Sequence, residues 1–222
     1  MRNLILASAS PRRRQLLALT GWAFAVRPVN ADETPRAGEP PEAFVRRMSE
    51  TKARMATSAA DVDALIIASD TTVVIDGHIL NKPADAAEAR AMLGRLRGRA
   101  HEVLTALTVL DTASGAAHTD LARSRVPMRD YSGDEVAAYV ATGDPLDKAG
   151  AYAIQHPHFQ PVERAQFVDC FANVMGLPLC HLLRRLRTLG VDSATDLPAE
   201  CQRFIPYDCP VHEQILNSMA AA

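Results

Sequence analysis

Continuous apolar runs and amphipathic stretches alternate along most of the chain. Residues 4–7 and 64–68 are apolar without interruption, as in strands that are buried on both faces of a sheet. Between them, residues 42–58 place Val45 and Met48 on one stripe, which is typical of an amphipathic helix. This alternation predicts an α/β fold.

Turn and capping signals predict the remaining elements. Asp76-Gly77 is typical of a type I′ hairpin, and Asp85 and Ser132 begin capping boxes at helix starts. Further expected elements are a strand over residues 21–29, antiparallel strands over 101–110 and 121–128, a loop leading into a strand over 148–155, and a helix over 179–189.

Ser10 and Pro11 predict a helix start directly after the first strand. Ser10 is a favourable N-cap, and Pro11 loses an N–H that would be unpaired anyway. Residues 12–14 are all arginine, although the helix dipole makes this end unfavourable for cations. A phosphate between the free N–H groups and the guanidinium groups would resolve the conflict. We therefore expect a phosphate site here; the alternative is a solvated basic face.

Lys52 and Asp70 are the next candidates for chemistry. Lys52 lies on the buried stripe of its helix, where an ammonium is either a snorkelling stem or a group that reaches into a cleft. Asp70 follows the apolar run 64–68, and ligands of open α/β sheets bind beyond the carboxyl ends of strands. We expect Asp70 to lie beyond the end of its strand, with the following hairpin bringing Lys82 near it.

The composition narrows the classes of function. Of 222 residues, 24 are basic and 26 acidic, and a net charge of −2 gives no global attraction to nucleic acid or anionic membrane. No apolar run approaches the roughly 18 residues of a membrane span, and the apolar segment after Met1 is too short for a signal peptide. The four cysteines lack CxxC spacing. We expect a reduced, cytoplasmic protein without a nucleic-acid or membrane partner.

Cations and carboxylates gather near the ends of the predicted strands and helices. Together they match the requirements of phosphoanhydride hydrolysis, in which cations neutralise a polyphosphate while carboxylates hold Mg²⁺ and activate water. The cations are Arg12, Arg13, Lys52, Lys82 and Lys148, and the carboxylates are Glu33 and Asp70.

Seven segments occur in the order of the Maf family, which the chain resembles from about residue 3 to residue 189. They are Ser8-Ala9-Ser10-Pro11-Arg12-Arg13, the Glu33 loop, Lys52-Ala53, Ser69-Asp70-Thr71, Lys82-Pro83, 148–155 and 173–179. The resemblance implies a nucleoside triphosphate pyrophosphatase that releases pyrophosphate, needs a divalent metal such as Mg²⁺ or Mn²⁺, and forms a homodimer. It also implies an elongated mixed sheet flanked by helices, with two lobes around a central cleft, as in Maf and ITPase-like proteins.

The resemblance implies a role for each matched residue. Asp70 matches the proton acceptor that activates water, and Glu33 matches an acidic position that holds the metal together with Asp70. Lys52 and Lys82 complete the catalytic group and are associated with the triphosphate. The substrate-binding positions are Ser8, Arg12, Arg13, Thr71, Lys148 and Gln155, of which Arg12, Thr71 and Gln155 distinguish the branch that acts on dTTP and UTP.

The loop after Gln155 departs from the family pattern and leaves the base preference open. Residues 156–164 replace a glycine and a short Ile-x-Gly loop. dTTP or UTP is the expected substrate. The alternatives are a modified pyrimidine triphosphate, another base such as 7-methyl-GTP, or a non-hydrolytic nucleotide-binding regulator of cell division. We expect His156 and His158 to belong to a solvated loop rather than to form a metal pair.

Residues 191–222 lie outside the resemblance and form a C-terminal extension to the domain of residues 1–190. Cys201, Cys209 and His212 have no identifiable fourth partner for a zinc site. We expect the extension to pack on the domain or to trail from it.

Overall fold

A six-stranded mixed sheet forms the centre of the computed structural model, which describes residues 2–59 and 61–218. The strands are β1 (Asn3–Leu6), β2 (Phe24–Val26), β3 (Ala64–Ile75), β4 (His78–Leu80), β5 (Ala100–Asp111) and β6 (Ala117–Pro127). Their order is β2-β1-β3-β5-β6, with β4 also paired to β3. β1 is parallel to β2 and β3, and the other pairs are antiparallel. β2 is shorter than the strand expected over residues 21–29.

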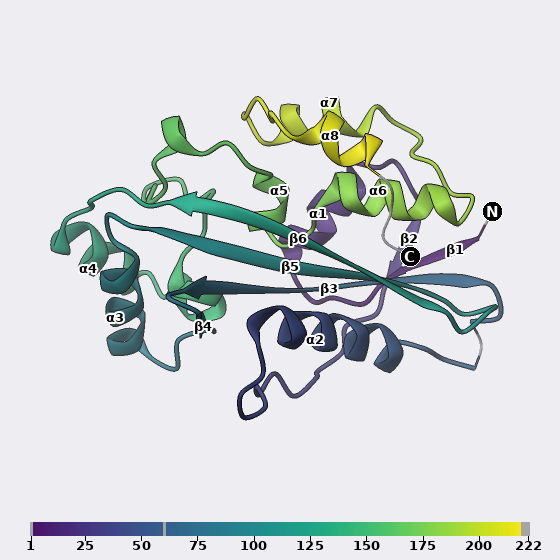
Figure 1. Ribbon diagram of the computed structural model, residues 1–222, viewed down its shortest axis with the longest axis horizontal. Helices are drawn as coiled ribbons and strands as arrows, with labels where there is room; N and C mark the ends of the chain where they lie inside the picture. Colours follow the sequence, from purple (N-terminus) through teal and green to yellow (C-terminus); the bar gives the residue numbers. More distant parts are fainter. Residues whose placement is uncertain (1, 60, 219–222) are drawn as a thin grey trace.

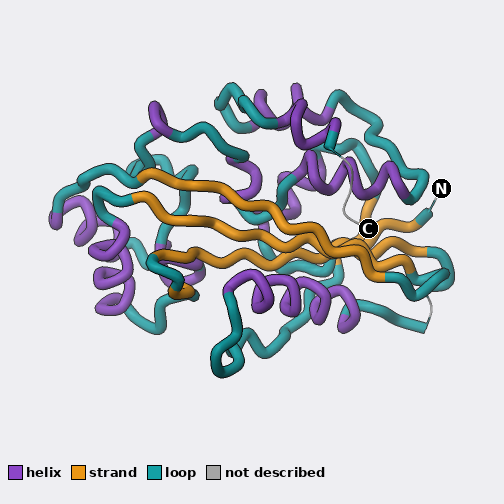
Figure 2. Tube along the Cα trace, viewed as in Figure 1, coloured by secondary structure: helices purple, strands orange, loops and turns teal. Residues whose placement is uncertain are grey.

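Helices cover both faces of the sheet (Figures 1 and 2). They are α1 (Pro11–Ala18), α2 (Pro41–Met55), α3 (Ala86–Leu96), α4 (Gly133–Ala141), α5 (Phe171–Val174), α6 (Leu179–Thr188), α7 (Leu197–Phe204) and α8 (His212–Asn217). α2 packs against one face of β3 and β5, whereas α1, α5 and α6 lie on the other, and α7 and α8 pack on α6. The expected elongated mixed sheet flanked by helices is confirmed. Among the described helices, none is long and apolar enough to cross a membrane.

β3 separates two apolar layers, because successive strand residues point to opposite faces of a sheet. Ile66 and Ala68 pack with Ala53 of α2. Leu65 and Ile67 point the other way, into the larger core that α1 and α6 share. The same alternation continues along β3 and fixes the face on which each later side chain emerges.

β3 is longer than its apolar run predicts. The prediction that Asp70 lies beyond the end of this strand is wrong, because β5 pairs along nearly the whole length of β3 and keeps it extended. On the opposite edge, β1 ends at Leu6, paired with Ile67, and β4 takes over only at Val73. Within the described residues, this leaves an unpaired gap along one edge of β3, and Asp70 lies in it.

Most local signals produce the expected elements. The side chains of Ser10, Asp85 and Ser132 each accept a hydrogen bond from the first turn of the helix that they begin. Asp76 and Gly77 both have positive φ and join β3 to β4. Capping and turn chemistry therefore acts here as the sequence predicts.

Segment 148–155 contradicts the prediction of a strand. Ala149–Ala151 form a 3₁₀ turn, in which Gly150 has a φ of 69°. A Cβ on Gly150 would lie 2.9 Å from the Val73 side chain. The segment crosses β3 too closely for any residue other than glycine at this point.

The C-terminal extension packs on the domain through apolar side chains. Leu197 and Ile205 are buried in the main core. The Tyr207 ring packs against Phe167 and Phe171, and its hydroxyl donates to the Phe167 carbonyl at 3.0 Å. Both α7 and the segment after it therefore hold the extension in place.

The four cysteines and His212 line one cavity of about 20 Å³ between the extension and the domain. None of the cysteines forms a disulfide. Burial raises the pKa of Cys180 and of Cys201 to about 12, so these thiols stay protonated and pack as apolar groups. No three His, Cys, Asp or Glu side chains in the described chain are placed to hold a metal.

Replacing Leu197 with alanine should destabilise the protein by about 2–5 kcal/mol, because truncation of a fully buried leucine leaves a cavity. Chemical denaturation measures the change in the free energy of unfolding. Val168→Ala is the control: Val168 is 65% exposed and its truncation should change that free energy by less than about 0.5 kcal/mol. Equal stabilities of Leu197→Ala and the wild type would contradict a contribution of the extension to the core.

Candidate active site

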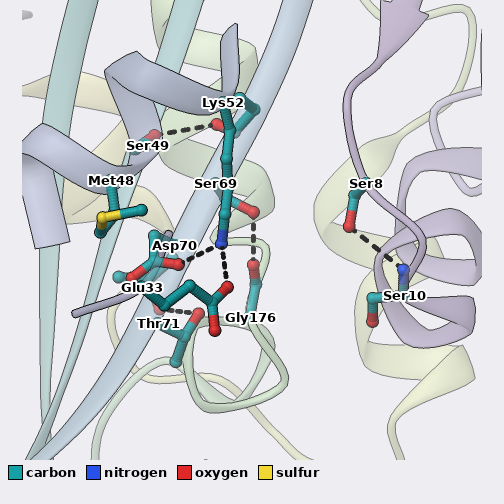
Figure 3. A network of polar contacts seen from close by, with 12 residues as sticks. Ser8, Ser10, Glu33, Met48, Ser49, Lys52, Ser69, Asp70, Thr71 and Gly176 are labelled. Carbon is teal, nitrogen blue, oxygen red and sulfur yellow. Dashed lines mark hydrogen bonds and ion pairs between the residues drawn. The ribbon is translucent and has the colours of Figure 1, made fainter. Parts of the chain in front are cut away.

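The Lys52 ammonium lies between two carboxylates (Figure 3). Its Nζ donates to Asp70 Oδ1 at 2.6 Å and to Glu33 Oε1 at 2.7 Å. The side chains of Lys52 and Asp70 are 10% and 9% exposed, and that of Glu33 is 41% exposed. Lys82 Nζ donates to the other Glu33 oxygen at 2.9 Å. These four residues form the Lys52 network, and Lys82 is joined to Asp70 through Glu33 and Lys52.

The two lysines make Glu33 strongly acidic. Partial burial raises the pKa of Glu33, but the hydrogen bonds and charges of Lys52 and then Lys82 outweigh it and bring the pKa to about 2. Glu33 is therefore ionised at neutral pH. Because this pKa is below the ordinary value of 4.5, the pairing stabilises the fold above about pH 4.5, and the stabilisation is lost as the pH falls toward 2.

Lys52 reaches this position because α2 packs directly on the sheet. Val45 and Met48 are buried on its inner stripe, and Lys52 continues that stripe. Ser49 Oγ, on the same helix, donates to the Ala68 carbonyl of β3 at 3.2 Å. Of the two interpretations left open by the sequence, the lysine that reaches into a polar site is the one observed.

A second polar network lies on the opposite face of β3, because Ser69 and Thr71 flank Asp70 and point away from α2. Arg13 donates from Nη2 to Thr71 Oγ1 at 3.1 Å and from Nε to the Gly176 carbonyl at 2.9 Å. Ser69 Oγ donates to the same carbonyl at 2.9 Å (Figure 3). The Arg13 network thus joins α1, β3 and the turn after α5.

Gly176 is a site residue to which sequence reasoning assigned no role. It has a φ of 101°, and a Cβ there would lie 3.2 Å from both Arg13 Nε and Thr71 Oγ1. Only glycine places the carbonyl between its donors without displacing them. A backbone carbonyl leaves no side-chain signal in a sequence, although Gly176 does lie in the matched segment 173–179.

Two serines order the chain before α1. Ser8 Oγ accepts hydrogen bonds from the Ser10 backbone N at 3.2 Å and from Arg13 Nη1 at 3.4 Å. Burial lowers the pKa of the Arg13 guanidinium, while the charges of Asp70 and Glu33 raise it. The carboxylates of the Lys52 network therefore offset part of the positive charge at this helix end. That a phosphate binds at this helix end stays a prediction.

The remaining predicted residues lie outside both networks. Lys148 is buried and pairs with Asp144 at 2.9 Å and with Asp147 at 2.6 Å, so carboxylates already balance its charge. The side chains of Arg12 and Gln155 form no hydrogen bond or ion pair with any residue of the described ranges. Gln155 lines a cavity of about 260 Å³. The structure thus brings Ser8 and Thr71 together with Arg13, but not Lys148.

His156 is held by the protein itself. Its Nδ1 accepts a hydrogen bond from the Phe159 backbone N at 2.8 Å, and its ring packs edge-on against Tyr139. This contact occupies Nδ1 and orients the imidazole within the loop. His156 therefore has a packing role in the loop that departs from the family pattern.

The Lys52 network has the donor groups of a metal-assisted phosphate site. Mg²⁺ in such sites takes one or two carboxylates and completes its octahedron with water and substrate phosphates. Glu33 and Asp70 fit this pattern, and Asp70 Oδ2 accepts no hydrogen bond from the described residues.

Carboxylates, lysines and an arginine around an unpaired strand edge define an α/β protein equipped to bind and cleave phosphates. The chain belongs to the Maf family: the family model described as "Maf-like protein" matches residues 3–189.

Curated relatives are similar over most of their length. The "dTTP/UTP pyrophosphatase" of Methylococcus capsulatus is 48% identical over 193 residues, which cover 86% of this chain and 93% of the relative. The protein of the same name from Citrifermentans bemidjiense is 41% identical over 85% of this chain and 96% of its own length. Among solved structures, the Staphylococcus aureus Ham1 protein covers 72% of this chain and 80% of its own, with a TM-score of 0.44 and 12% identity. That likeness is too distant to bear on function.

Replacing Lys52 with methionine should raise the pKa of Glu33 from about 2 toward 4.5, because Lys52 lowers it more than any other group. NMR titration of the Glu33 carboxyl carbon measures the change. Lys82→Met is the matched control and should produce a smaller rise, since Lys82 contributes less. A Glu33 pKa that is the same in Lys52→Met and in the wild type would contradict the ion-paired network.

Proposed function

We propose that this protein hydrolyses dTTP and UTP to the nucleoside monophosphate and pyrophosphate with the help of a divalent metal ion. The main structural support for this function is the buried Lys52 ammonium between Asp70 and Glu33 at the unpaired edge of β3. Relatives named for this activity, up to 48% identical, support the choice of substrate.

Asp70 is the proposed proton acceptor for the attacking water. Lys52 holds its Oδ1 at 2.6 Å and thereby fixes the carboxylate plane, while Oδ2 has no partner among the described residues. The free oxygen is available to a water molecule beside a bound phosphate. A positioned general base of this kind accelerates a reaction by about 10²–10⁴-fold.

Cations on both sides of β3 are proposed to bind the triphosphate. Lys82 is 53% exposed and contacts Glu33 through a flexible stem, so it can turn to a phosphate. Arg13, Ser8 and the Arg12 N–H at the start of α1 form a second cradle for phosphate oxygens, since Ser10 already accepts from the N–H groups of Arg13 and Arg14. Cleavage of a phosphoanhydride depends mainly on such positioning and charge stabilisation. Lys148 would take part only by giving up a carboxylate partner.

Glu33 and Asp70 are the proposed ligands of the metal, either Mg²⁺ or Mn²⁺. When bound, the ion would neutralise phosphate charge and acidify water. The pKa of about 2 keeps Glu33 ionised at neutral pH, and Glu33 would bind the ion through the oxygen that Lys82 releases when it turns to a phosphate. Lys52 holds the two carboxylates together despite their like charges.

Base selection is assigned to Arg12, Thr71 and Gln155 on the resemblance. The side chains of Arg12 and Gln155 have no partner among the described residues and are free to contact a ligand. Thr71, in contrast, accepts a hydrogen bond from Arg13. A homodimer and a cytoplasmic location are proposed on the resemblance and the composition alone.

Purified protein with Mg²⁺ or Mn²⁺ should release pyrophosphate from dTTP and UTP faster than from purine triphosphates and 7-methyl-GTP. Chelation of the metal by EDTA should stop the reaction, because the metal ion is proposed to join the carboxylates of the site to the substrate phosphates. A pyrophosphate-release assay over this panel is the test. Tight nucleotide binding without turnover of any triphosphate would favour the regulator alternative, and equal rates on purines would overturn the pyrimidine assignment.

Asp70→Asn should lower kcat by about 10²–10⁴-fold, because the amide keeps the shape of the side chain but cannot accept the proton. Circular dichroism and the kcat for dTTP measure fold and activity on the same preparation. Asp130→Asn is the control: Asp130 is a surface carboxylate paired with Arg97, and its replacement should leave kcat unchanged. Asp70→Asn with near-wild-type kcat would rule out the proposed base.

A further inference from the structure

The cavity beside Gln155 has one wall made by the C-terminal extension. Its volume is about 260 Å³, near the lower end of the roughly 300–1,000 Å³ range of small-molecule sites. The domain contributes Gln15, Gln155 and Met175, and the extension contributes Phe204, Ile205 and Pro206. The extension, residues 191–222, lies beyond residue 189, where the match to the family model ends. This wall is therefore an addition of this chain to the matched domain.

Phe204 is placed at the cavity without being needed to anchor the extension. Its side chain is 42% exposed, although an exposed phenylalanine forfeits the hydrophobic gain of burial. Leu197 before Phe204, and Ile205 and Tyr207 after it, hold the extension on the core. An aromatic ring left open on a well-anchored segment offers a flat apolar surface to a ligand.

The cavity adjoins the Arg13 network. Met175, in its lining, precedes Gly176, whose carbonyl accepts hydrogen bonds from Arg13 and Ser69. On α1, Gln15 lies three residues after Arg12, so both residues are on the same side of the helix. The cavity therefore borders the turn at Gly176 and the side of α1 that carries Arg12, and the proposal places the phosphates at this helix start and the base in the cavity.

The cavity combines an apolar wall with unused amide groups. The side-chain amides of Gln155 and Gln15 form no hydrogen bond with the described residues, so each presents a free donor and acceptor. A pyrimidine base has the matching chemistry: two flat apolar faces and an edge of alternating donors and acceptors.

We propose that Phe204 of the C-terminal extension forms the face on which the base of a bound pyrimidine nucleotide packs. This assignment rests on the proposed function and makes Phe204 a specificity-determining residue outside the matched domain. Packing on the ring would favour binding of every base, while the space that the ring fills would exclude the larger purines. Loss of the ring should therefore weaken pyrimidine binding and relax the discrimination against purines.

Steady-state kinetics of Phe204→Ala on dTTP and dGTP test the proposal. Removal of one aromatic–base contact should raise the KM for dTTP about ten-fold and leave kcat within about two-fold, since no reacting atom lies at the cavity. The ratio of kcat/KM for dTTP over dGTP should fall. Phe204→Tyr keeps the ring and should restore the wild-type KM. Calorimetric binding of dTMP, which needs no turnover, should weaken by the same factor.

Arg203→Ala is the matched control, because Arg203 lies beside Phe204 but pairs with Glu200 on the surface and does not line the cavity. It should leave both kinetic constants unchanged. Wild-type kinetics for Phe204→Ala in a protein that hydrolyses dTTP would overturn the role of Phe204 and leave the proposed function intact. A KM that rises equally in Arg203→Ala would overturn it as well. A wild-type protein that neither turns over nor binds pyrimidine nucleotides would overturn the proposed function itself.

Discussion

The pairing of the Lys52 ammonium with Asp70 and Glu33 is the contact on which the rest of the site depends. A buried charge is costly unless it is paired, and removal of one partner leaves the other uncompensated. Lys52 satisfies this condition with two carboxylates, both within 2.7 Å. It thereby joins α2, β3 and the Glu33 loop, and through Glu33 it reaches Lys82. Several segments distant in sequence meet at one ammonium group.

β3 organises the site because it carries polar residues on both of its faces. Asp70 points to α2, while Ser69 and Thr71 point to α1 and Gly176. A register slip of one residue would exchange these faces, so the pairing with β5 protects the chemistry as well as the fold. The gap between β1 and β4 exposes this stretch of β3 at the sheet edge, and the charges of Asp70 and Glu33 act on Arg13 from the other network.

The extension adds apolar side chains to the core of the family domain and one wall to the cavity beside Gln155. Its buried residues, Leu197 and Ile205, are those that an amphipathic segment needs in order to dock on a core. The cysteines support the same view, because protonated thiols in an apolar cavity pack as small hydrophobic groups. Docking of the extension thus adds a wall to a cavity that the domain alone would leave more open.

The sequence by itself determined the local features of this protein. The caps at Ser10, Asp85 and Ser132 and the turn at Asp76-Gly77 depend on neighbouring residues only, and they were predicted correctly. The resemblance to the Maf family also located the residues of the Lys52 network, because their segments match in order.

Only the tertiary structure decided the features that depend on distant partners. The extent of β3 past Asp70 is set by β5, and the turn at Gly150 by close contact with Val73. The role of Gly176 comes from a backbone carbonyl and a positive φ, neither of which a side-chain pattern reports. The pairing of Lys148 with Asp144 and Asp147 is likewise a feature of the tertiary structure, because a sequence shows a charge but not the partners that balance it.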